Sequence, residues 1–355
     1  MLKLSITRAS LSVFQTRRLR HIHCSTISCA PTQVKLQTPL FLRPPDHKVT
    51  LADLKKWHLW AKNISSLVGS RFLDIDNGPD STLLHRELDW FIEDAIEQPK
   101  SLTEDNYNMS LEVSIRASLD DLYRLWNQRI EERRPFQYIV GCEHWRDLVL
   151  CVQEGVLIPR LETELIVDLV ENATKRNAEL KEGVWADLGT GSGALAIGVG
   201  MILGPSGRVI AVDLSPTAVA VASYNVQRYL LQDTITVKQG SWFEPLKDCQ
   251  LTGIVSNPPY IPSSHISGLQ AEVAQHEPRV ALDGGADGLD DLLHICNGAA
   301  SLLKPGGFFA FETNGEEQSQ FLANYLTNEA KCFYGVEMTS DFAGIRRFVT
   351  GYKKE

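Results

Sequence analysis

The chain has 355 residues, 43% of them hydrophobic and 22% charged, which is an ordinary globular composition and a length sufficient for two domains. No run of apolar residues approaches the ~18 that a membrane-spanning helix needs. The seven cysteines are scattered and form no C-x-x-C pair. This spacing argues against a zinc site and a disulfide framework, and it fits a reducing compartment. We therefore expect neither a membrane span nor a bound metal.

Charge is distributed unevenly along the chain. Residues 1–45 contain seven Lys or Arg and no acid, so the formal charge of −9 leaves −9 − 7 = −16 for the remainder. A segment rich in Arg and Ser, free of acids and mixed with apolar residues is typical of a mitochondrial transit peptide, and predicts a protein of the mitochondrial matrix. A disordered basic tail is the alternative. The acidic remainder disfavours direct binding to nucleic acid.

Residues 46–135 are predicted to form a small helical domain. Apolar residues recur at helical spacing in "STLLHRELDWFIEDAIEQP" and in "SLDDLYRLWNQRIEERRP", and each stretch ends at a proline. We find no chemical motif here. The tryptophans of this region are interpreted as core residues, and a role in docking a protein substrate is the expectation for the domain.

The pattern changes after Pro135. Residues 136–163 contain β-rich pieces around Gly141 and Gly155, which predict a β-hairpin linker. Over residues 164–355, strands such as "VWADLGT", "RVIAVDLS" and "GIVSNPPY" alternate with helical stretches. This alternation predicts an α/β domain with a parallel, doubly wound sheet.

A glycine-rich loop follows the first of these strands. In "DLGTGSG" the spacing is G-x-G-x-G, which is neither the dinucleotide motif G-x-G-x-x-G nor a P-loop, so phosphate is not the implied ligand. Asp213 ends the next strand, where a carboxylate can accept hydrogen bonds from a ribose diol. Together these features predict S-adenosylmethionine, with Trp242 or Phe243 packing on its adenine. A tight turn with a capping Asp, and a core role for Trp242, are the alternatives. The cofactor-binding residues that these motifs predict are Asp187, Gly189, Gly191, Gly193, Asp213 and Trp242.

The stretch "SNPPYIP" ends the fourth strand at the same edge of the sheet. Proline has no N–H, so the carbonyls of Pro258 and Pro259 can serve as acceptors without a neighbouring donor. The Asn257 side chain offers a second acceptor, and Tyr260 a flat face. Two acceptors on one NH₂ group would hold a planar amide or amine in the geometry of its reaction. We predict Asn257, Pro258 and Tyr260 as catalytic, and Asn257 to Tyr260 as substrate-binding.

From Pro135 onward the chain resembles the HemK family of class I methyltransferases. The resemblance rests on four stretches: "PFQYIVG" with "GVLIPRLETE", "DLGTGSG", "NPPYIP" and "EPRVALDGGADGLD". It implies a Rossmann-like, seven-stranded methyltransferase domain joined by a β-hairpin to a helical N-terminal domain. It also implies that S-adenosylmethionine is contacted by Gly189, Thr190, Gly191, Ser192, Gly193, Asp213, Trp242 and Asn257. The tail would supply the last two strands, one of them antiparallel.

The resemblance also implies a reaction. The methyl group of S-adenosylmethionine would pass to the side-chain nitrogen (N5) of the glutamine in the Gly-Gly-Gln motif of peptide chain release factors. With the transit-like N-terminus, the expected partners are class I mitochondrial release factors. The chain departs from the family pattern at Leu161, where a proline is usual, and at Ser241, where an acid is common. Arg160, Glu162 and Thr163 of the first motif are present.

Three points stay open on the sequence. The charged stretch Glu277 to Asp290 could gate the pocket or contact a release factor, or Glu277 and Arg279 could be structural. Asn-Pro-Pro-Tyr also occurs in adenine-N6 and other nucleic-acid amine methyltransferases, so that activity is the alternative function. A protein that keeps the fold only for binding or assembly is the third interpretation, and the intact turn argues against it.

Overall fold

The computed structural model describes residues 34–99 and 108–355, so most of the predicted transit peptide lies outside the described residues. The folded part of the chain begins before residue 45. Leu40 is fully buried in the helical core, and the side chain of Gln37 donates to the carbonyl of Tyr138 at 2.9 Å. Over the described residues, no helix is long and apolar enough to cross a membrane.

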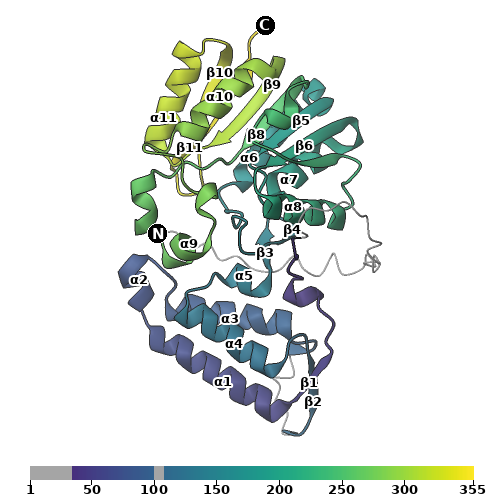
Figure 1. Ribbon diagram of the computed structural model, residues 1–355, viewed down its shortest axis with the longest axis vertical. Coiled ribbons are helices and arrows are strands. Elements are labelled where there is room, and N and C mark those ends of the chain that lie inside the picture. Colours follow the sequence, from purple (N-terminus) through teal and green to yellow (C-terminus); the bar gives the residue numbers. More distant parts are fainter. Residues whose placement is uncertain (1–33, 100–107) are drawn as a thin grey trace.

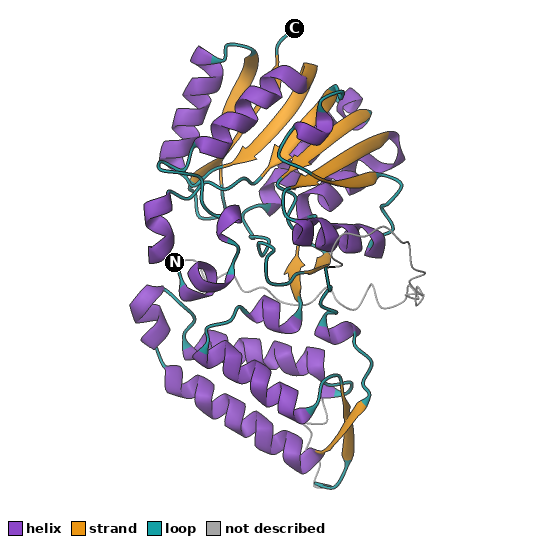
Figure 2. Ribbon diagram, in the orientation of Figure 1, coloured by secondary structure: helices purple, strands orange, loops and turns teal. Residues whose placement is uncertain are grey.

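A helical bundle forms one end of the molecule (Figures 1 and 2). Three of its helices begin at polar caps that accept a backbone N–H: Thr50 for α1, Asp80 for α3 and Ser118 for α4. Trp57 and Trp126 are completely buried in the bundle. The helices are α1 (Leu51–Val68), α2 (Arg71–Asp76), α3 (Ser81–Ala95), α4 (Leu119–Glu131) and α5 (Phe136–Val140).

Two features of this end differ from the sequence prediction. A small antiparallel sheet, β1 (His47–Thr50) with β2 (Glu112–Ile115), closes the bundle, although only helices were expected. Each strand is four residues long and its partner lies far away in the sequence, so neither gives a clear period. The second difference is α5, which occupies the start of the predicted hairpin linker. The hairpin itself is β3 (Cys142–Trp145) with β4 (Leu148–Cys151).

The other end is a seven-stranded sheet with helices on both faces (Figure 2). The strand order is β10-β11-β9-β8-β5-β6-β7, with β11 antiparallel to its neighbours and the remaining strands parallel. The predicted fold class and the single antiparallel tail strand are thus confirmed. The strands are β5 (Gly183–Leu188), β6 (Gly207–Asp213), β7 (Ile235–Gln239), β8 (Leu251–Ser256), β9 (Leu303–Glu312), β10 (Phe333–Ser340) and β11 (Arg346–Lys353).

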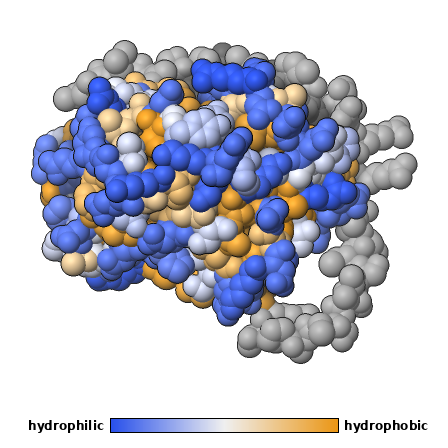
Figure 3. Space-filling model, turned by 90° about the horizontal axis from the view of Figure 1, so that it is seen from above, coloured by the Kyte–Doolittle hydropathy of each residue, from blue (hydrophilic) through white to orange (hydrophobic). Residues whose placement is uncertain are grey.

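Alternate residues of each strand enter two separate cores, as the two-residue period of a strand requires. On β5, for example, Trp185 packs with α6 and α7, whereas Ala186 packs with α10 and α11. Seen from above in Figure 3, this end carries hydrophilic side chains interspersed with hydrophobic ones. The helices are α6 (Glu164–Arg176), α7 (Ala194–Leu203), α8 (Pro216–Arg228), α9 (Ala271–His276), α10 (Asp290–Leu302) and α11 (Glu316–Asn324).

A buried ionic cluster joins the two ends through α9, which lies between them in Figure 1. Arg129 of α4 donates to Glu87 of α3 at 2.6 Å and to Glu272 of α9 at 2.9 Å. Arg133 donates to Glu272 from Nε at 2.7 Å and also to Asp76 at 3.0 Å. Because each carboxylate meets a guanidinium, the burial of these charges is compensated, and α9 is fixed to the helical bundle.

Candidate active site

A cavity of about 440 Å³ opens at the carboxyl ends of β5, β6 and β8. Its wall combines the glycine loop, the loops after β6 and β7, the Asn257 turn, and the linker from Gly155 to Thr163. This is the edge at which open parallel sheets bind ligands, and the volume lies in the range of small-molecule sites. Segments far apart in the sequence thus meet at the place that the motifs predict.

The glycine loop turns sharply after β5. Gly189, Gly191 and Gly193 all have positive φ, at 72°, 55° and 85°, a conformation that side chains other than glycine rarely adopt. Gly191 faces open space and its N–H donates to Asp213 at 2.8 Å. Gly193 does not line the cavity. A Cβ there would lie 3.3 Å from Ala222, so this glycine allows α7 to approach α8 rather than a ligand to approach the loop.

Asp187 lies beneath the loop instead of lining the cavity. It is fully buried, and its Oδ2 accepts from the Thr190 hydroxyl at 2.6 Å and from the N–H of Ala196 at 2.9 Å. Its Oδ1 is buried with no hydrogen-bond partner among the described residues. Burial raises the pKa of this carboxyl to about 7. Direct contact of Asp187 with the cofactor was the sequence prediction; the observed contacts make it a support for the loop.

Asp213 lines the cavity at the end of β6, as predicted. Its two oxygens accept backbone N–H groups of Gly191 and Ser215, at 2.8 and 2.9 Å, and burial raises its pKa. Each carboxylate oxygen has two lone pairs. A fixed carboxylate with unused lone pairs at this edge can therefore accept hydrogen bonds from a ribose diol.

Trp242 also lines the cavity, together with Ser241. Its φ of 44° is unusual for a residue other than glycine. The indole ring lies against Gly189, 3.5 Å from the position of a Cβ there, and Asp291 lines the same cavity. Backbone strain of this kind persists where the surrounding structure holds a side chain in one place. Phe243 instead packs in the core beside Gly298.

The Asn257 turn carries a chain of side-chain hydrogen bonds that the sequence did not predict. Asn257 Nδ2 donates to Thr163 Oγ1 at 2.9 Å, and the Thr163 hydroxyl donates to Glu312 Oε2 at 2.7 Å. Tyr260 donates its hydroxyl to Glu312 Oε1 at 3.1 Å. Thr163 had been noted only as part of a family motif, and Glu312 not at all. The signal was available, because Glu312 is an acid at the carboxyl end of a buried apolar strand.

The four residues of the turn are not equivalent. Asn257 and Pro259 line the cavity, whereas Pro258 is buried and Tyr260 packs against the core behind it. Tyr260 is half-buried, and its hydroxyl is bound to Glu312, so the protein occupies part of the surface that was expected to face a substrate. Stacking of a substrate on its ring stays a prediction. The two predicted acceptor atoms of the turn have no partner within the protein's described residues. Within the described residues, no hydrogen bond reaches Asn257 Oδ1 or the carbonyl of Pro258.

The stretch from Glu277 to Asp290 supports the turn. Glu277 is buried and accepts from Arg160 at 2.7 Å and from the N–H of Ile158 at 3.1 Å, which is a structural role. The loop that follows packs on the turn itself. A Cβ at Gly284 would lie 2.8 Å from the carbonyl oxygen of Pro259, so only glycine permits this approach. Leu161 sits in a turn that keeps its hydrogen bond to Glu164, at 3.1 Å.

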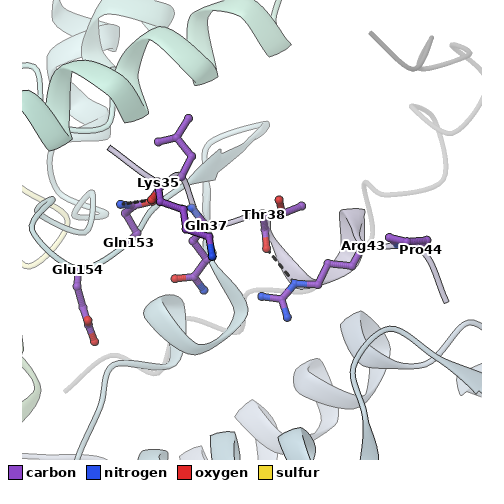
Figure 4. Close-up of a pocket in the computed structure, with 8 residues that line it drawn as sticks. Lys35, Gln37, Thr38, Arg43, Pro44, Gln153 and Glu154 are labelled. Carbon is purple, nitrogen blue, oxygen red and sulfur yellow. Dashed lines mark hydrogen bonds between the residues drawn. The ribbon is translucent and has the colours of Figure 1, made fainter. Parts of the chain in front are cut away.

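A second, larger hollow of about 630 Å³ lies elsewhere, beside the hairpin (Figure 4). Its wall includes Lys35, Gln37, Arg43, Gln153 and Glu154, and none of the predicted site residues. Size alone therefore does not identify the active site; the chemistry of the wall does. Among residues 34–99 and 108–355, no group of three or more His, Cys, Asp or Glu is placed to hold a metal ion.

Comparison with known proteins agrees with this geometry. A family model described as "Methyltransferase small domain" matches residues 163–279. Release factor glutamine methyltransferase of Gloeobacter violaceus is 42% identical over 240 residues, 67% of this chain and 82% of that protein. The protein of the same name from Synechocystis sp. is 40% identical, over 67% of this chain and 80% of that protein. A solved ribosomal protein L11 methylase from Lactobacillus delbrueckii subsp. bulgaricus covers 57% of this chain and 84% of its own, with 20% identity and a TM-score of 0.41.

Fold, glycine loop and relatives together define a class I methyltransferase that uses S-adenosylmethionine, so the predicted enzyme class and cofactor are confirmed. Within that class, the chain belongs to the release factor glutamine methyltransferase family, HemK.

The residues present fit this cofactor. S-adenosylmethionine supplies an electrophilic methyl group on a sulfonium centre. Asp213 has acceptors for its ribose, Gly191 leaves space for its close approach, and Trp242 offers an aromatic wall. Beneath the same loop, Asp187 Oδ1 is a buried acceptor that has no hydrogen-bond partner among the described residues.

Proposed function

We propose that this protein methylates the side-chain nitrogen (N5) of a glutamine in class I mitochondrial peptide chain release factors, in the Gly-Gly-Gln motif. The observation that carries the proposal is the state of the Asn257 side chain. Its N–H is taken by Thr163, so its carbonyl oxygen is the atom left to accept from a substrate. The relatives supply the substrate class, because they are named as release factor glutamine methyltransferases.

The turn addresses the main difficulty of this chemistry. An amide nitrogen is a poor nucleophile, because its lone pair is delocalised into the carbonyl group. Acceptors at Asn257 Oδ1 and the carbonyl of Pro258 would bind both N–H hydrogens of the glutamine. Such binding favours the geometry in which the lone pair points at the methyl group. The nitrogen–methyl bond then forms as the sulfur–methyl bond breaks, and the amide proton, now more acidic, leaves to an acceptor or to water.

Mitochondrial location is part of the proposal. Its support is the segment of residues 1–45, which has seven cations and no acid. A fluorescent protein fused to residues 1–45 tests this location. Isolated mitochondria with an energised inner membrane should import the fusion. A fusion that stays in the cytosol of intact cells would remove this part of the proposal and leave the enzyme activity unaffected.

The activity is tested by incubating the protein with S-adenosylmethionine and individual mitochondrial release factors, then analysing the Gly-Gly-Gln peptide by mass spectrometry. A mass increase of one methyl group on the glutamine is expected, and a release factor carrying Gly-Gly-Glu is the matched control. An unmodified glutamine, with labelled methyl transferred to DNA or RNA instead, would contradict the proposal and favour the nucleic-acid alternative.

A further inference from the structure

Glu312 is a buried acid without an ionic partner. It ends β9, is 1% exposed, and forms no salt bridge among the described residues. Its contacts are two hydroxyls, those of Thr163 and Tyr260. A carboxylate in such a place loses most of its hydration and regains only part of it from neutral donors. A buried amide or apolar side chain at this position would cost less stability than a carboxylate. The presence of an acid therefore points to a role other than stability.

Other charged groups near Glu312 do not neutralise it. Arg347 of β11 lies close enough to favour the ionised form, but it is bound to Asp341 at 2.6 Å. Glu162, in the turn before α6, disfavours the ionised form. Burial is the largest effect and raises the pKa of Glu312 to about 7. Glu312 is therefore poised to change its protonation near neutral pH, whereas the hydroxyls of Thr163 and Tyr260 keep their protons.

The hydrogen bonds have a direction that follows from the charge of Glu312. An ionised carboxylate can only accept, so the single proton of the Thr163 hydroxyl points to Glu312. The oxygen of Thr163 must then act as acceptor toward Asn257, and the matching atom of the amide is Nδ2. This leaves Oδ1 as the polar atom of Asn257 for the cavity. If Glu312 is protonated and donates to Thr163, the hydroxyl proton is free to point at Asn257, and the opposite orientation of the amide becomes equally acceptable.

The wrong orientation would be harmful to the reaction. It would present the NH₂ group of Asn257 to the NH₂ group of the substrate, donor against donor. We propose that Glu312 is a positioning residue that acts through Thr163 to keep the carbonyl of Asn257 directed at the substrate, and through Tyr260 to hold the turn in place. This inference rests on the proposed function for its substrate, but the hydrogen-bond direction is a property of the protein itself.

A kinetic experiment compares two substitutions at Thr163. Thr163→Val keeps the shape and removes the hydroxyl, so kcat should fall about 100-fold because the acceptor is no longer held in place. Thr163→Ser keeps the hydroxyl and should recover most of the rate. The Kd for S-adenosylmethionine, measured by calorimetry, should change little in both. A kcat in Thr163→Val equal to that of the unmodified protein, or a serine variant as slow as the valine variant, would overturn the proposal.

A second experiment needs no substrate. Selective ¹⁵N labelling of asparagine side chains gives an NMR signal for the NH₂ group of Asn257, assigned by its absence in Asn257→Asp. This signal should shift as the pH falls through the pKa of Glu312, and the shift should be absent in Glu312→Gln and in Thr163→Val. A signal that does not respond to pH between 5.5 and 8.5, in steps of about half a unit, would overturn the proposal.

The two experiments separate this inference from the proposed function. If release factors are not methylated but the Asn257 signal titrates with Glu312, the positioning role stands and the substrate is different. If the glutamine is methylated but neither the rate nor the signal depends on Thr163 and Glu312, the function stands and the positioning role is wrong.

Discussion

Two buried glutamates show how differently the two regions of this molecule use charge. Glu272, at the junction between the helical bundle and the sheet domain, is bound by Arg129 and Arg133, and its pKa is lowered by those guanidiniums despite its burial. Glu312, at the edge of the sheet, is hydrogen-bonded by the hydroxyls of Thr163 and Tyr260 and by no cation among the described residues, and burial raises its pKa to about 7. The first glutamate is compensated and holds two parts together. The second has no paired cation in the described part of the chain, so its pKa is shifted, as is common for ionisable groups at functional sites.

The junction can be broken by removing one cation. Arg129→Met leaves Glu87 and Glu272 buried without their shared partner, and the free energy of unfolding should fall by about 3 to 5 kcal/mol. Urea unfolding followed by circular dichroism would measure this loss. The matched control is Arg134→Met, because Arg134 pairs with the exposed Glu154 and should contribute less than about 1 kcal/mol. Equal losses in the two variants would mean that burial does not distinguish these ion pairs.

At the edge of the sheet, the expected loss is in rate rather than in stability. Asn257→Ala removes the acceptor presented to the substrate, and kcat should fall about 10²- to 10³-fold. The Kd for S-adenosylmethionine should stay within about threefold of its original value, since the contribution of Asn257 is chiefly to the transition state. Single-turnover kinetics and calorimetry measure the two quantities. A loss of cofactor affinity in proportion to the rate would make Asn257 a binding residue instead.

Asp213→Ala should show the reverse pattern. Loss of the ribose acceptors should weaken S-adenosylmethionine binding about 10- to 100-fold, because each hydrogen bond to a charged group contributes about 1.5 to 3 kcal/mol and part of that is recovered by water. At saturating cofactor, kcat should change less than the Kd does. Asp213→Asn, which keeps one oxygen acceptor, is the matched control. Its Kd for S-adenosylmethionine should lie between that of the unmodified protein and that of Asp213→Ala. A Kd unaffected by either substitution would remove Asp213 from the cofactor site.

The smallest effect expected is a difference in the pH dependence of stability. Because the folded pKa of Glu312 is raised to about 7, above its unfolded value, the cost of ionising Glu312 in the folded state grows as the pH rises from the unfolded pKa and is complete above about pH 7. Glu312→Gln should therefore be more stable than the unmodified protein at pH 8, by about 1 to 2 kcal/mol, and this advantage should be clearly smaller at pH 5.5. Differential scanning calorimetry at both pH values measures the difference.

Glu272→Gln provides the contrast, because the folded pKa of Glu272 is lowered. The stability that Glu272 contributes is present above its unfolded pKa and is lost only as the pH falls through its folded pKa. Glu272→Gln should therefore be less stable than the unmodified protein at both pH 8 and pH 5.5. If Glu312→Gln and Glu272→Gln changed the stability in the same direction at pH 8, the proposed difference between the two regions would be wrong.

Local pattern in the sequence was sufficient for much of the fold and for the position of the site. Alternation of strands and helices predicted the sheet, and the motifs around Gly191 and Asn257 predicted the edge at which the cavity lies. These features depend on residues close together in the chain. The β1–β2 pair escaped prediction, because two four-residue strands separated by the whole of α1 to α3 have no local signature.

The contacts within the site were harder to predict for the same reason. Glu312 meets Thr163 across 149 positions of sequence, and Glu272 meets Arg129 across 143. No spacing rule connects such residues; only the fold brings them together. Asp187 shows the converse, because its place in the motif was correct while its direction was not. Whether a side chain at a strand end points into a cavity or beneath a loop depends on packing that the sequence does not display.

The close contact between the Asn257 turn and the loop of Gly284 to Gly288 has a consequence for how this enzyme can change. A Cβ at Gly288 would lie 2.2 Å from the carbonyl oxygen of Tyr260, and Gln318 fills the space beside it. Neither segment can be redesigned or exchanged alone without displacing the other. For protein engineering, residues 257–262 and 284–288 form one module, and a change of substrate specificity would have to transplant both.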